Sequence, residues 1–283
     1  MVDLGTLITN LWIVLLVFFF LVPQLQRSLV NTARHSLLQK IGKTRRSNVI
    51  TLIHRQETIS FLAIPLSRYI DIDDSEEVLR AIRLTPKDTP IDIILHTPGG
   101  ILLAASQIAL ALNAHPAKKT VIVPHYAMSG GTLIAFAADE IAMDPHAVLG
   151  PVDPQLMEGN ASYPAVSLLK VLDKKKIDEV DDRTIILADE AKKAMVQNES
   201  LVRKILAGRY SDETVNKIVD ELVSGKYTHD NPIMADQASA IGLKISTQVP
   251  GEIYDLMRLY KMGTTVRRPG VEFVPSRWSP PGR

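Results

Sequence analysis

The sequence predicts an α/β protein with a parallel sheet, preceded by one N-terminal transmembrane helix. Short runs of apolar, β-branched residues alternate with longer segments in which apolar residues recur at helical spacing. Strands that are apolar on both faces are typical of parallel sheets covered by helices. A long apolar segment stands at the start of the chain. The composition, with 46% hydrophobic and 22% charged residues among 283, argues against general disorder.

Several function classes are excluded by what the chain lacks. It has no cysteine, which excludes disulfide scaffolds, thiolate zinc sites, iron–sulfur clusters and cysteine nucleophiles. After residue 46 acidic residues slightly outnumber basic ones, so there is no basic footprint for nucleic acid. No G-x-G-x-x-G motif occurs, and His54, His96 and His115 have no partners at metal-ligand spacing. We therefore expect no cofactor, no metal site and no nucleic-acid partner.

Residues 4–22 are predicted to form an uncleaved membrane anchor. The run from Leu11 to Val22 is wholly apolar, and its extension back to Leu4 approaches the length of about 20 residues that spans a bilayer. No basic residue precedes the run, as a secretory signal peptide would require. Basic residues follow it at positions 27, 34, 40, 43, 45 and 46, so the positive-inside rule predicts a single-pass protein with its body in the cytoplasm. A buried core helix is the alternative.

Residues 23–46 are predicted to form a basic amphipathic linker helix. Apolar residues recur at helical spacing between residues 25 and 41, while Arg27, Arg34 and Lys40 occupy the other face. Such a helix could lie on anionic lipid. It could equally pack against the body or a neighbouring subunit, and the sequence leaves both arrangements open.

The body, residues 47–263, begins with alternating strands and helices. The strands are β-branched, apolar runs bounded by charged residues, Pro or Gly, and they are expected at Val49–Ile53, Thr58–Ala63, Ile91–His96, Thr120–Pro124, Glu140–Met143 and Ala147–Leu149. The helices between them are expected at Asp73–Leu84, where acidic residues come first as the helix dipole favours, at Ile101–Asn113 and at Gly130–Ala138.

The second half of the body is predicted to be mostly helical. Helical spacing occurs at residues 164–176, 183–207 and 211–223, and short edge strands are expected at Lys226–Thr228 and Leu243–Ser246. The Pro- and Arg-rich tail, residues 264–283, is expected to be disordered.

Two glycine-containing turns, each between a predicted strand and a predicted helix, point to chemistry. They are H-T-P-G-G at residues 96–100 and A-M-S-G-G at residues 127–131. Paired glycines let backbone N–H groups face a site without side chains in the way, and a helix N-terminus behind them favours negative charge. Ser129 is therefore suited to act as a nucleophile beside an oxyanion hole. The alternative is two ordinary turns, with Ser129 as a helix N-cap.

Three longer stretches contain these turns and a later motif: IDIILHTPGG, VIVPHYAMSGGTLIAFAADEIAMDPHAVLGPVDPQL and GKYTHDNPIMADQASAIGL. They resemble the SDH (serine dehydrogenase proteinase) family, which consists of membrane-anchored serine peptidases related to signal peptide peptidase A. The resemblance implies a ClpP/crotonase-type superhelix of repeated ββα units. It also implies a homo-oligomer, because relatives assemble as rings or other oligomers.

The resemblance assigns Ser129 as the nucleophile and takes the oxyanion-hole N–H donors from Gly99 or Gly100 and from Gly130. It places the general base on a downstream helix, where Lys170 stands among apolar neighbours. A lysine amine acts as a base when burial keeps it neutral. The alternative for Lys170 is a side chain that reaches solvent from an amphipathic helix.

The family has also been described with a Ser, Asp, His triad in that chain order, which would recruit Asp153 and His229 as an alternative base pair. His229 precedes Asp230 at a predicted turn, where loop capping is the structural alternative. His146 follows Ser129 closely, beside a predicted strand, and is not expected to be catalytic. The choice between a Ser–Lys dyad and a Ser–Asp–His triad stays open.

The resulting expectation is a serine peptidase, anchored in the cell membrane with a cytoplasmic catalytic domain. Its substrates are expected to be polypeptides, with apolar or membrane-adjacent segments favoured because the anchor holds the site near the bilayer. Two alternatives remain. One is an acyl-CoA enzyme of the crotonase branch, which shares the oxyanion hole. The other is an inactive peptidase-fold scaffold for membrane partners.

Overall fold

The computed structural model describes residues 12–13, 15–54, 69–159, 161–260 and 271–274, and these form a mixed α/β structure. Within them, the main sheet has six strands in the order β10-β5-β3-β2-β1-β11. The strands from β10 to β1 run parallel, and β11 pairs antiparallel with β1. Their bounds are β1 Asn48–Ile53, β2 Ile91–His96, β3 Lys119–Val123, β5 Glu140–Met143, β10 Ile245–Ser246 and β11 Val271–Val274.

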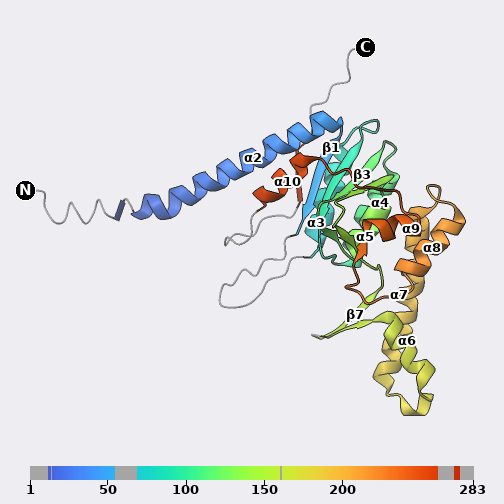
Figure 1. The fold of residues 1–283 in the computed structure, drawn as a ribbon. Coiled ribbons are helices and arrows are strands. Elements are labelled where there is room, and N and C mark those ends of the chain that lie inside the picture. Colours follow the sequence, from blue (N-terminus) through green and yellow to red (C-terminus); the bar gives the residue numbers. More distant parts are fainter. Residues whose placement is uncertain (1–11, 14, 55–68, 160, 261–270, 275–283) are drawn as a thin grey trace, which may run out of the picture.

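Helices cover both faces of this sheet, because successive residues of a strand point to opposite faces and both sets are apolar. On one face, Ile93 and Val121 belong to a core shared with α3 Ile72–Leu84, α4 Leu102–Ala114 and α5 Gly130–Phe136. On the other face, Ile94 and Ile122 pack with α2 Val22–Arg45 and α10 Gly251–Leu259. Figure 1 shows α2 and α10 on one side of the strands and α4 and α5 on the other.

A second, smaller sheet stands beside the main one and has the order β4-β6-β9. It consists of β4 Tyr126–Ala127, β6 Val148–Leu149 and β9 Ile233–Met234. β3, β4 and α5 follow one another as a strand–strand–helix unit, the type of unit that the family resemblance implies, with its two strands in different sheets. β4 and β6 are parallel and β9 is antiparallel to β6, so the ends of β4 and β6 lie at the same edge as the start of β9.

The remaining elements extend the molecule beyond the main sheet. The hairpin strands β7 Gln155–Glu158 and β8 Ala161–Pro164 lead into α6 Ala165–Lys174, which is followed by the 3₁₀ turn η2 Ile177–Glu179, α7 Asp182–Leu206, α8 Asp212–Leu222 and α9 Ala235–Ile241. Ala165 and Leu168 of α6 pack on Ala191 of α7 in a small core of their own.

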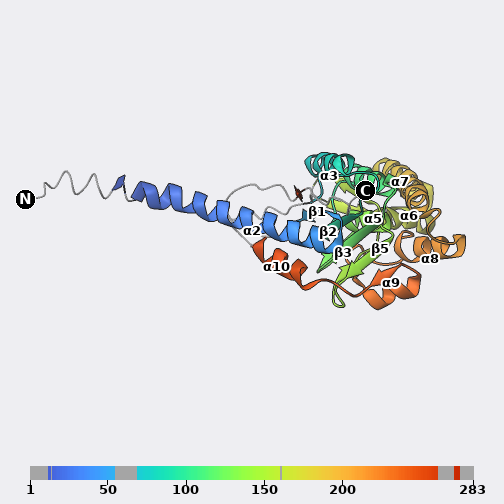
Figure 2. The ribbon, with the colours of Figure 1, turned by 90° about the horizontal axis from the view of Figure 1, so that it is seen from above.

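The second half of α2 packs on the body, which decides between the two arrangements that the sequence leaves open for this part of the linker. Arg34 is buried, donates hydrogen bonds of 2.7 and 3.1 Å to the Leu259 carbonyl and stacks 4.1 Å over the Tyr260 ring. The first half of α2, preceded by the π-helical turn η1 Val17–Leu21, points away from the body (Figures 1 and 2). Leu25 and Leu29 on this half are exposed.

A partly buried ion pair joins α2 to the sheet. The Arg45 Nε lies 2.5 Å from Oδ2 of Asp92, which is buried on β2, and the Ser47 hydroxyl donates to the same oxygen at 2.6 Å. The hydrogen bond to Asp92 raises the pKa of the Arg45 guanidinium. The long helix is thus fixed at its C-terminal end to the second strand of the sheet.

Most predicted elements of the body are confirmed to within two residues at each end, but several segments differ. Strands β4 and β9 and helices α9 and α10 were not predicted. The strand predicted at Lys226–Thr228 is wrong, because Lys226 and Tyr227 bind Glu221 at the end of α8 and the chain turns there. The hairpin of β7 and β8 was not predicted. Val271–Val274 forms strand β11 within the tail for which disorder is expected, because it adds to the free edge of β1. The predicted strand Thr58–Ala63 lies outside the described residues.

About half of the predicted anchor, residues 4–22, lies outside the described part of the chain, since residues 1–11 and 14 are not described. Among the helices that are described, none combines the length and the apolar character needed to cross a membrane.

Candidate active site

The two glycine turns meet at the C-terminal edge of the sheet. Thr97, directly after β2, donates its N–H to the Tyr126 carbonyl at 3.1 Å and accepts from the Met128 N–H at 2.9 Å. This pairing brings Gly99 against Ser129: a Cβ added to Gly99 would lie 2.8 Å from the Ser129 Cβ. Gly99 also has φ +106°, a conformation that other residues rarely adopt. A glycine is therefore required where the first turn touches the second.

Ser129 has a strained backbone and no capping role. Its φ of 51° and ψ of −117° lie outside the regions that non-glycine residues favour, at a cost of about 1–3 kcal/mol. Its side chain makes no capping hydrogen bond, although it stands directly before α5. The N-cap alternative is therefore wrong. The hydroxyl is partly exposed and has no hydrogen-bond partner among the described residues.

Two backbone N–H groups beside Ser129 have no acceptor within the described part of the chain: those of Gly100 and Gly130. A Cβ added to Gly130 would lie 3.6 Å from the Gly100 nitrogen, so both groups belong to one small region. Gly130 is the first residue of α5, where the helix dipole favours negative charge. The Gly99 N–H is different, because it donates to Thr97 Oγ1 at 3.2 Å and is not free.

Asp153 and His229 form a pair at the same edge of the small sheet. Asp153 follows β6 and His229 precedes β9, and their Oδ1 and Nδ1 atoms lie 2.6 Å apart. Asp153 is buried, whereas the His229 side chain is 35% exposed. The Gln155 amide donates to the other Asp153 oxygen at 2.6 Å, a partner that the sequence analysis did not identify. The Nε2 of His229 has no partner among the described residues.

A buried hydroxyl links the Ser129 turn to the segment that carries Asp153. Thr132 Oγ1 donates to the Ala127 carbonyl at 2.7 Å and accepts from the Gly150 N–H at 3.0 Å. A Cβ on Gly150 would lie 2.5 Å from the Met128 side chain, so the two segments are in contact just behind Ser129. Ser129 and Asp153 therefore follow the parallel strands β4 and β6 at one edge of the small sheet, and His229, which is paired with Asp153, precedes β9 at the same edge.

Lys170 is exposed on α6, and no ion pair or hydrogen bond involves its amine among the described residues. The physical reason for choosing it, burial among apolar neighbours, is not met. α6 packs on α7 through Ala165 and Leu168, and Figure 1 shows it beyond the main sheet. His146 is exposed as well.

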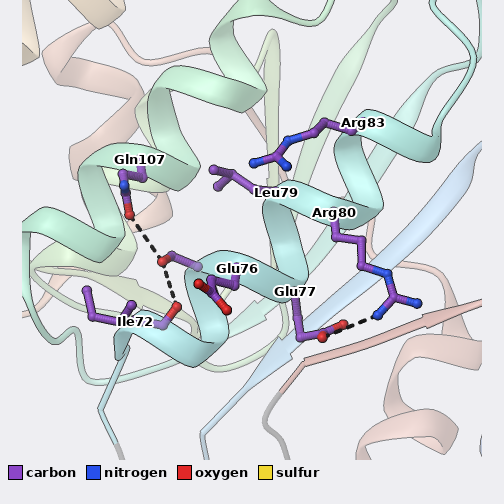
Figure 3. Close-up of a pocket in the computed structure, with 8 residues that line it drawn as sticks. Ile72, Glu76, Glu77, Leu79, Arg80, Arg83 and Gln107 are labelled. Carbon is purple, nitrogen blue, oxygen red and sulfur yellow. Dashed lines mark hydrogen bonds and ion pairs between the residues drawn. The ribbon is translucent and has the colours of Figure 1, made fainter.

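A pocket of about 420 Å³ lies elsewhere, at the surface of α3 and α4 (Figure 3). Its lining combines apolar and charged side chains: Ile72, Ser75, Glu76, Glu77, Leu79, Arg80, Arg83 and Gln107. No candidate catalytic residue lines it. Across the described residues, no group of three or more His, Asp or Glu side chains is arranged to hold a metal ion.

Comparison with known proteins gives a family match along the chain. Residues 1–282 match the family described as ClpP-like SDH-type serine proteinase. Among relatives from Methanocaldococcus jannaschii, the uncharacterized protein MJ0137 is 51% identical over 272 residues, which cover 96% of this chain and 93% of that protein. The uncharacterized protein MJ1495 is 47% identical over 262 residues, which cover 92% and 87%.

The solved structures that match this chain have much lower sequence identity. ClpP1 from Listeria monocytogenes is 16% identical, with a TM-score of 0.44, and the match covers 75% of this chain and 96% of that one. A mutant of the 1510-N membrane-bound stomatin-specific protease is also 16% identical, with a TM-score of 0.37 and coverage of 68% and 79%.

The backbone strain at Ser129 predicts how substitutions at this position change the free energy of unfolding. Ser129→Gly should unfold with a free energy about 1 kcal/mol higher than Ser129→Ala, because glycine accepts a positive φ without strain. Ser129→Ala should match the wild type, since no cap is lost. Urea unfolding measures both. The control is Ser211→Ala, which removes a true N-cap bond to the Thr214 N–H and should cost about 1 kcal/mol. A loss of about 1 kcal/mol in the free energy of unfolding of Ser129→Ala, equal to that of Ser211→Ala, would contradict the conclusion that Ser129 has no capping role.

Proposed function

Because the chain belongs to the family of ClpP-like SDH-type serine proteinases, we propose that it is a membrane-anchored serine peptidase with Ser129 as nucleophile. The observation that carries the proposal is the strained Ser129 beside the Gly100 and Gly130 N–H groups, which have no acceptor among the described residues. A nucleophile at a strained strand-to-helix turn, with two N–H donors at hand, suits the attack on a carbonyl carbon.

In the proposed mechanism, His229 Nε2 takes the Ser129 hydroxyl proton while the oxygen attacks the peptide carbonyl carbon. The Gly100 and Gly130 N–H groups stabilise the oxyanion of the tetrahedral intermediate. The protonated His229 then donates its proton to the leaving amine, and water hydrolyses the acyl enzyme with His229 again as base. Asp153 accepts from Nδ1, which keeps Nε2 free to act and stabilises the imidazolium.

The Asp153–His229 pair is preferred to Lys170 as the source of the base. The buried Asp153 carboxylate lies close to Nδ1 of His229. The other ring nitrogen, Nε2, therefore points away from Asp153. Lys170 is exposed, so the burial that would make its amine suitable as a base is absent. Lys170 remains the alternative base, and a direct comparison of variants decides between the two.

Family membership also bears on the two rival functions. An acyl-CoA enzyme of the crotonase branch would use the oxyanion hole but would not need the serine. A scaffold would need neither, and would have no use for the strain stored at Ser129. The peptidase assignment accounts for both features.

Exposed apolar residues beside the donor Gly100 favour apolar polypeptide segments as substrates. Ile101, Leu102 and Leu103 follow Gly100 directly and are 50%, 43% and 60% exposed. Tyr69, next to the Ile70 bridge to Gly100, is 52% exposed. Such a surface would bind the apolar side chains of an extended chain whose carbonyl reaches Ser129.

The N-terminal end of the chain supports the anchor. Trp12, Phe18, Phe19 and Phe20 are between 62% and 66% exposed, on a helical arm that points away from the body. Water would not favour such a cluster, whereas lipid would. We therefore retain a single-pass anchor over residues 4–22, a cytoplasmic catalytic domain and, from the resemblance to peptidase relatives, a homo-oligomer.

The nucleophile is tested with a fluorophosphonate probe on the purified full chain. The probe should label Ser129, and Ser129→Ala should lose the label and at least about 1,000-fold in peptidase rate, because removal of a nucleophile leaves only binding and oxyanion stabilisation. Ser239→Ala, which changes an exposed serine on α9, should keep both. Labelling at another serine, or an active Ser129→Ala enzyme, would refute the assignment.

The base is tested by comparing His229→Ala with Lys170→Ala. His229→Ala should lose activity by about three orders of magnitude or more, and the Ser129→Ala, His229→Ala double variant should be no slower than Ser129→Ala, since members of one catalytic unit are non-additive. Lys170→Ala should retain activity because its side chain is exposed. An inactive Lys170→Ala enzyme and an active His229→Ala enzyme, both folded, would reverse the choice.

The anchor is tested by membrane fractionation of the full chain and of a variant without residues 1–22. The full chain should stay in the membrane pellet at alkaline pH and the shortened chain should not, because about 20 apolar residues are needed to span the bilayer. Protease added to intact cells should leave the body undigested. A full chain released at alkaline pH would contradict the anchor, and digestion from outside would contradict the orientation.

A further inference from the structure

A chain of buried polar groups stands behind the Gly99–Gly100 turn, and the mechanism above does not use it. It consists of Asp74 in the first turn of α3, His54 directly after β1, and Thr97 directly after β2. Their exposed fractions are 3%, 0% and 0%. Polar groups buried to this degree are costly unless they contact one another. These groups come from three separate elements, so their meeting needs an explanation.

The contacts form a continuous line from a carboxylate to a backbone amide. Asp74 Oδ2 lies 3.0 Å from His54 Nε2, an ion-pair distance, although the ring N–H is not aligned for a full hydrogen bond. His54 Nδ1 lies 3.0 Å from Thr97 Oγ1. The Gly99 N–H donates to the same hydroxyl oxygen at 3.2 Å.

The carboxylate at one end determines the hydrogen-bond direction at the other. Asp74 can only accept, so it favours the tautomer of His54 with the proton on Nε2. Nδ1 must then accept, and the Thr97 hydroxyl donates to it. This leaves the lone pairs of Oγ1 for the Gly99 N–H. With the opposite tautomer, Oγ1 would accept from His54 and its proton would turn to the Gly99 carbonyl, 3.3 Å away.

Gly99 is thereby held at both of its backbone polar groups. Its N–H is bound to Thr97, and its carbonyl accepts from the Ile70 N–H at 2.8 Å. The peptide that joins Gly99 to Gly100 is planar and trans, so the Gly100 N–H points opposite to the Gly99 carbonyl. With that carbonyl directed at Ile70, the Gly100 N–H faces away from Ile70 and has no acceptor among the described residues.

The two attachments of Gly99 share one support in α3. Asp71 and Asp74 exchange backbone-to-side-chain hydrogen bonds of 3.0 and 3.1 Å in a capping box, which fixes the Asp74 carboxylate. Asp71 directly follows Ile70, the residue that binds the Gly99 carbonyl. The start of α3 therefore positions both the carbonyl partner and, through His54 and Thr97, the N–H partner of Gly99.

We propose that Asp74, His54 and Thr97 are positioning residues that keep the Gly100 N–H directed into the oxyanion hole, an inference that rests on the proposed peptidase function. They do not form a second catalytic base. His54 is fully buried, with Asp74 beside Nε2 and the Thr97 hydroxyl beside Nδ1, so the Ser129 proton does not reach either nitrogen. The role of the network is to hold the donor in place before the oxyanion forms, which lowers the cost of reorganisation in the transition state.

The test compares Thr97→Val with Thr97→Ser in the full chain. Valine keeps the branched shape, including the methyl group that a Cβ on Gly131 would approach to 2.6 Å, but has no hydroxyl; serine keeps the hydroxyl. The rate is expressed per active site, counted by fluorophosphonate labelling. Thr97→Val should lower kcat by about 10- to 100-fold with KM little changed, because the oxyanion exists only in the transition state. Thr97→Ser should stay within a few-fold of the wild type.

His54→Gln and a control variant complete the design. His54→Gln should also lower kcat, and its combination with Thr97→Val should be no slower than the slower single variant, because the two residues act through one contact. Thr120→Val, which changes a buried threonine on β3, should keep the wild-type kcat per labelled site. A purely structural role of Thr97 would reduce the number of labelled sites or the melting temperature but not kcat per site.

Amide hydrogen exchange provides a readout that does not depend on activity. The Gly99 N–H should exchange at least about 10-fold faster in Thr97→Val than in the wild type or in Thr120→Val, because its acceptor is gone. Wild-type kcat per site in Thr97→Val, an equally slow Thr97→Ser, or unchanged Gly99 exchange would overturn the proposal. An unlabelled, inactive wild type with the expected exchange would instead refute the peptidase function while the network still holds the turn.

Discussion

The contact between Gly99 and Ser129 is the constraint on which the candidate site depends. A Cβ at Gly99 would lie 2.8 Å from the Ser129 Cβ and 3.0 Å from the Met128 carbonyl oxygen, so only glycine lets the two turns approach. The parallel pairing of β2 with β3 brings both turns to one edge, and Thr97 then joins them through its hydrogen bonds to Tyr126 and Met128. The serine and the N–H groups of the two turns come together only because of this approach.

Much of the fold was predictable because the central strands are mostly apolar and point apolar residues to both faces. β1, β2 and β3 are buried throughout, which requires a helical layer on both faces and leaves parallel pairing as the consistent arrangement. The segments that sequence reasoning missed depend on distant partners. β11 is a strand only because the edge of β1, more than 200 residues earlier, accepts it. The C-terminal half of α2 packs inward because Arg34 finds the Leu259 carbonyl and the Tyr260 ring.

In the candidate site too, some residues could be predicted from a local motif, whereas others depend on contacts between distant parts of the chain. The glycine–serine motif suggested Ser129 as a nucleophile, and the family resemblance added Gly99 or Gly100 and Gly130 as N–H donors. Neither could show that the Thr97 hydroxyl occupies the Gly99 N–H. The prediction for Lys170 took apolar neighbours as a sign of burial. On a helix, residues two apart face different sides, so Leu168 packs toward α7 while Lys170 reaches solvent. His54 and Asp74 carry no local signal and meet only in the folded chain.

Two aspartate–histidine pairs, Asp153 with His229 and Asp74 with His54, differ in burial, and this difference suits them to different roles. In both pairs a carboxylate lies within 3.0 Å of one ring nitrogen and so favours one tautomer. The second nitrogen of His229 is partly exposed and has no partner among the described residues, so it can exchange a proton with a substrate. The second nitrogen of His54 meets the Thr97 hydroxyl in a site without solvent, so its proton state can only orient neighbours. The same pair of residue types thus leaves one nitrogen open in His229, the proposed base, and favours one hydrogen-bond direction at His54, where protein groups lie against both nitrogens.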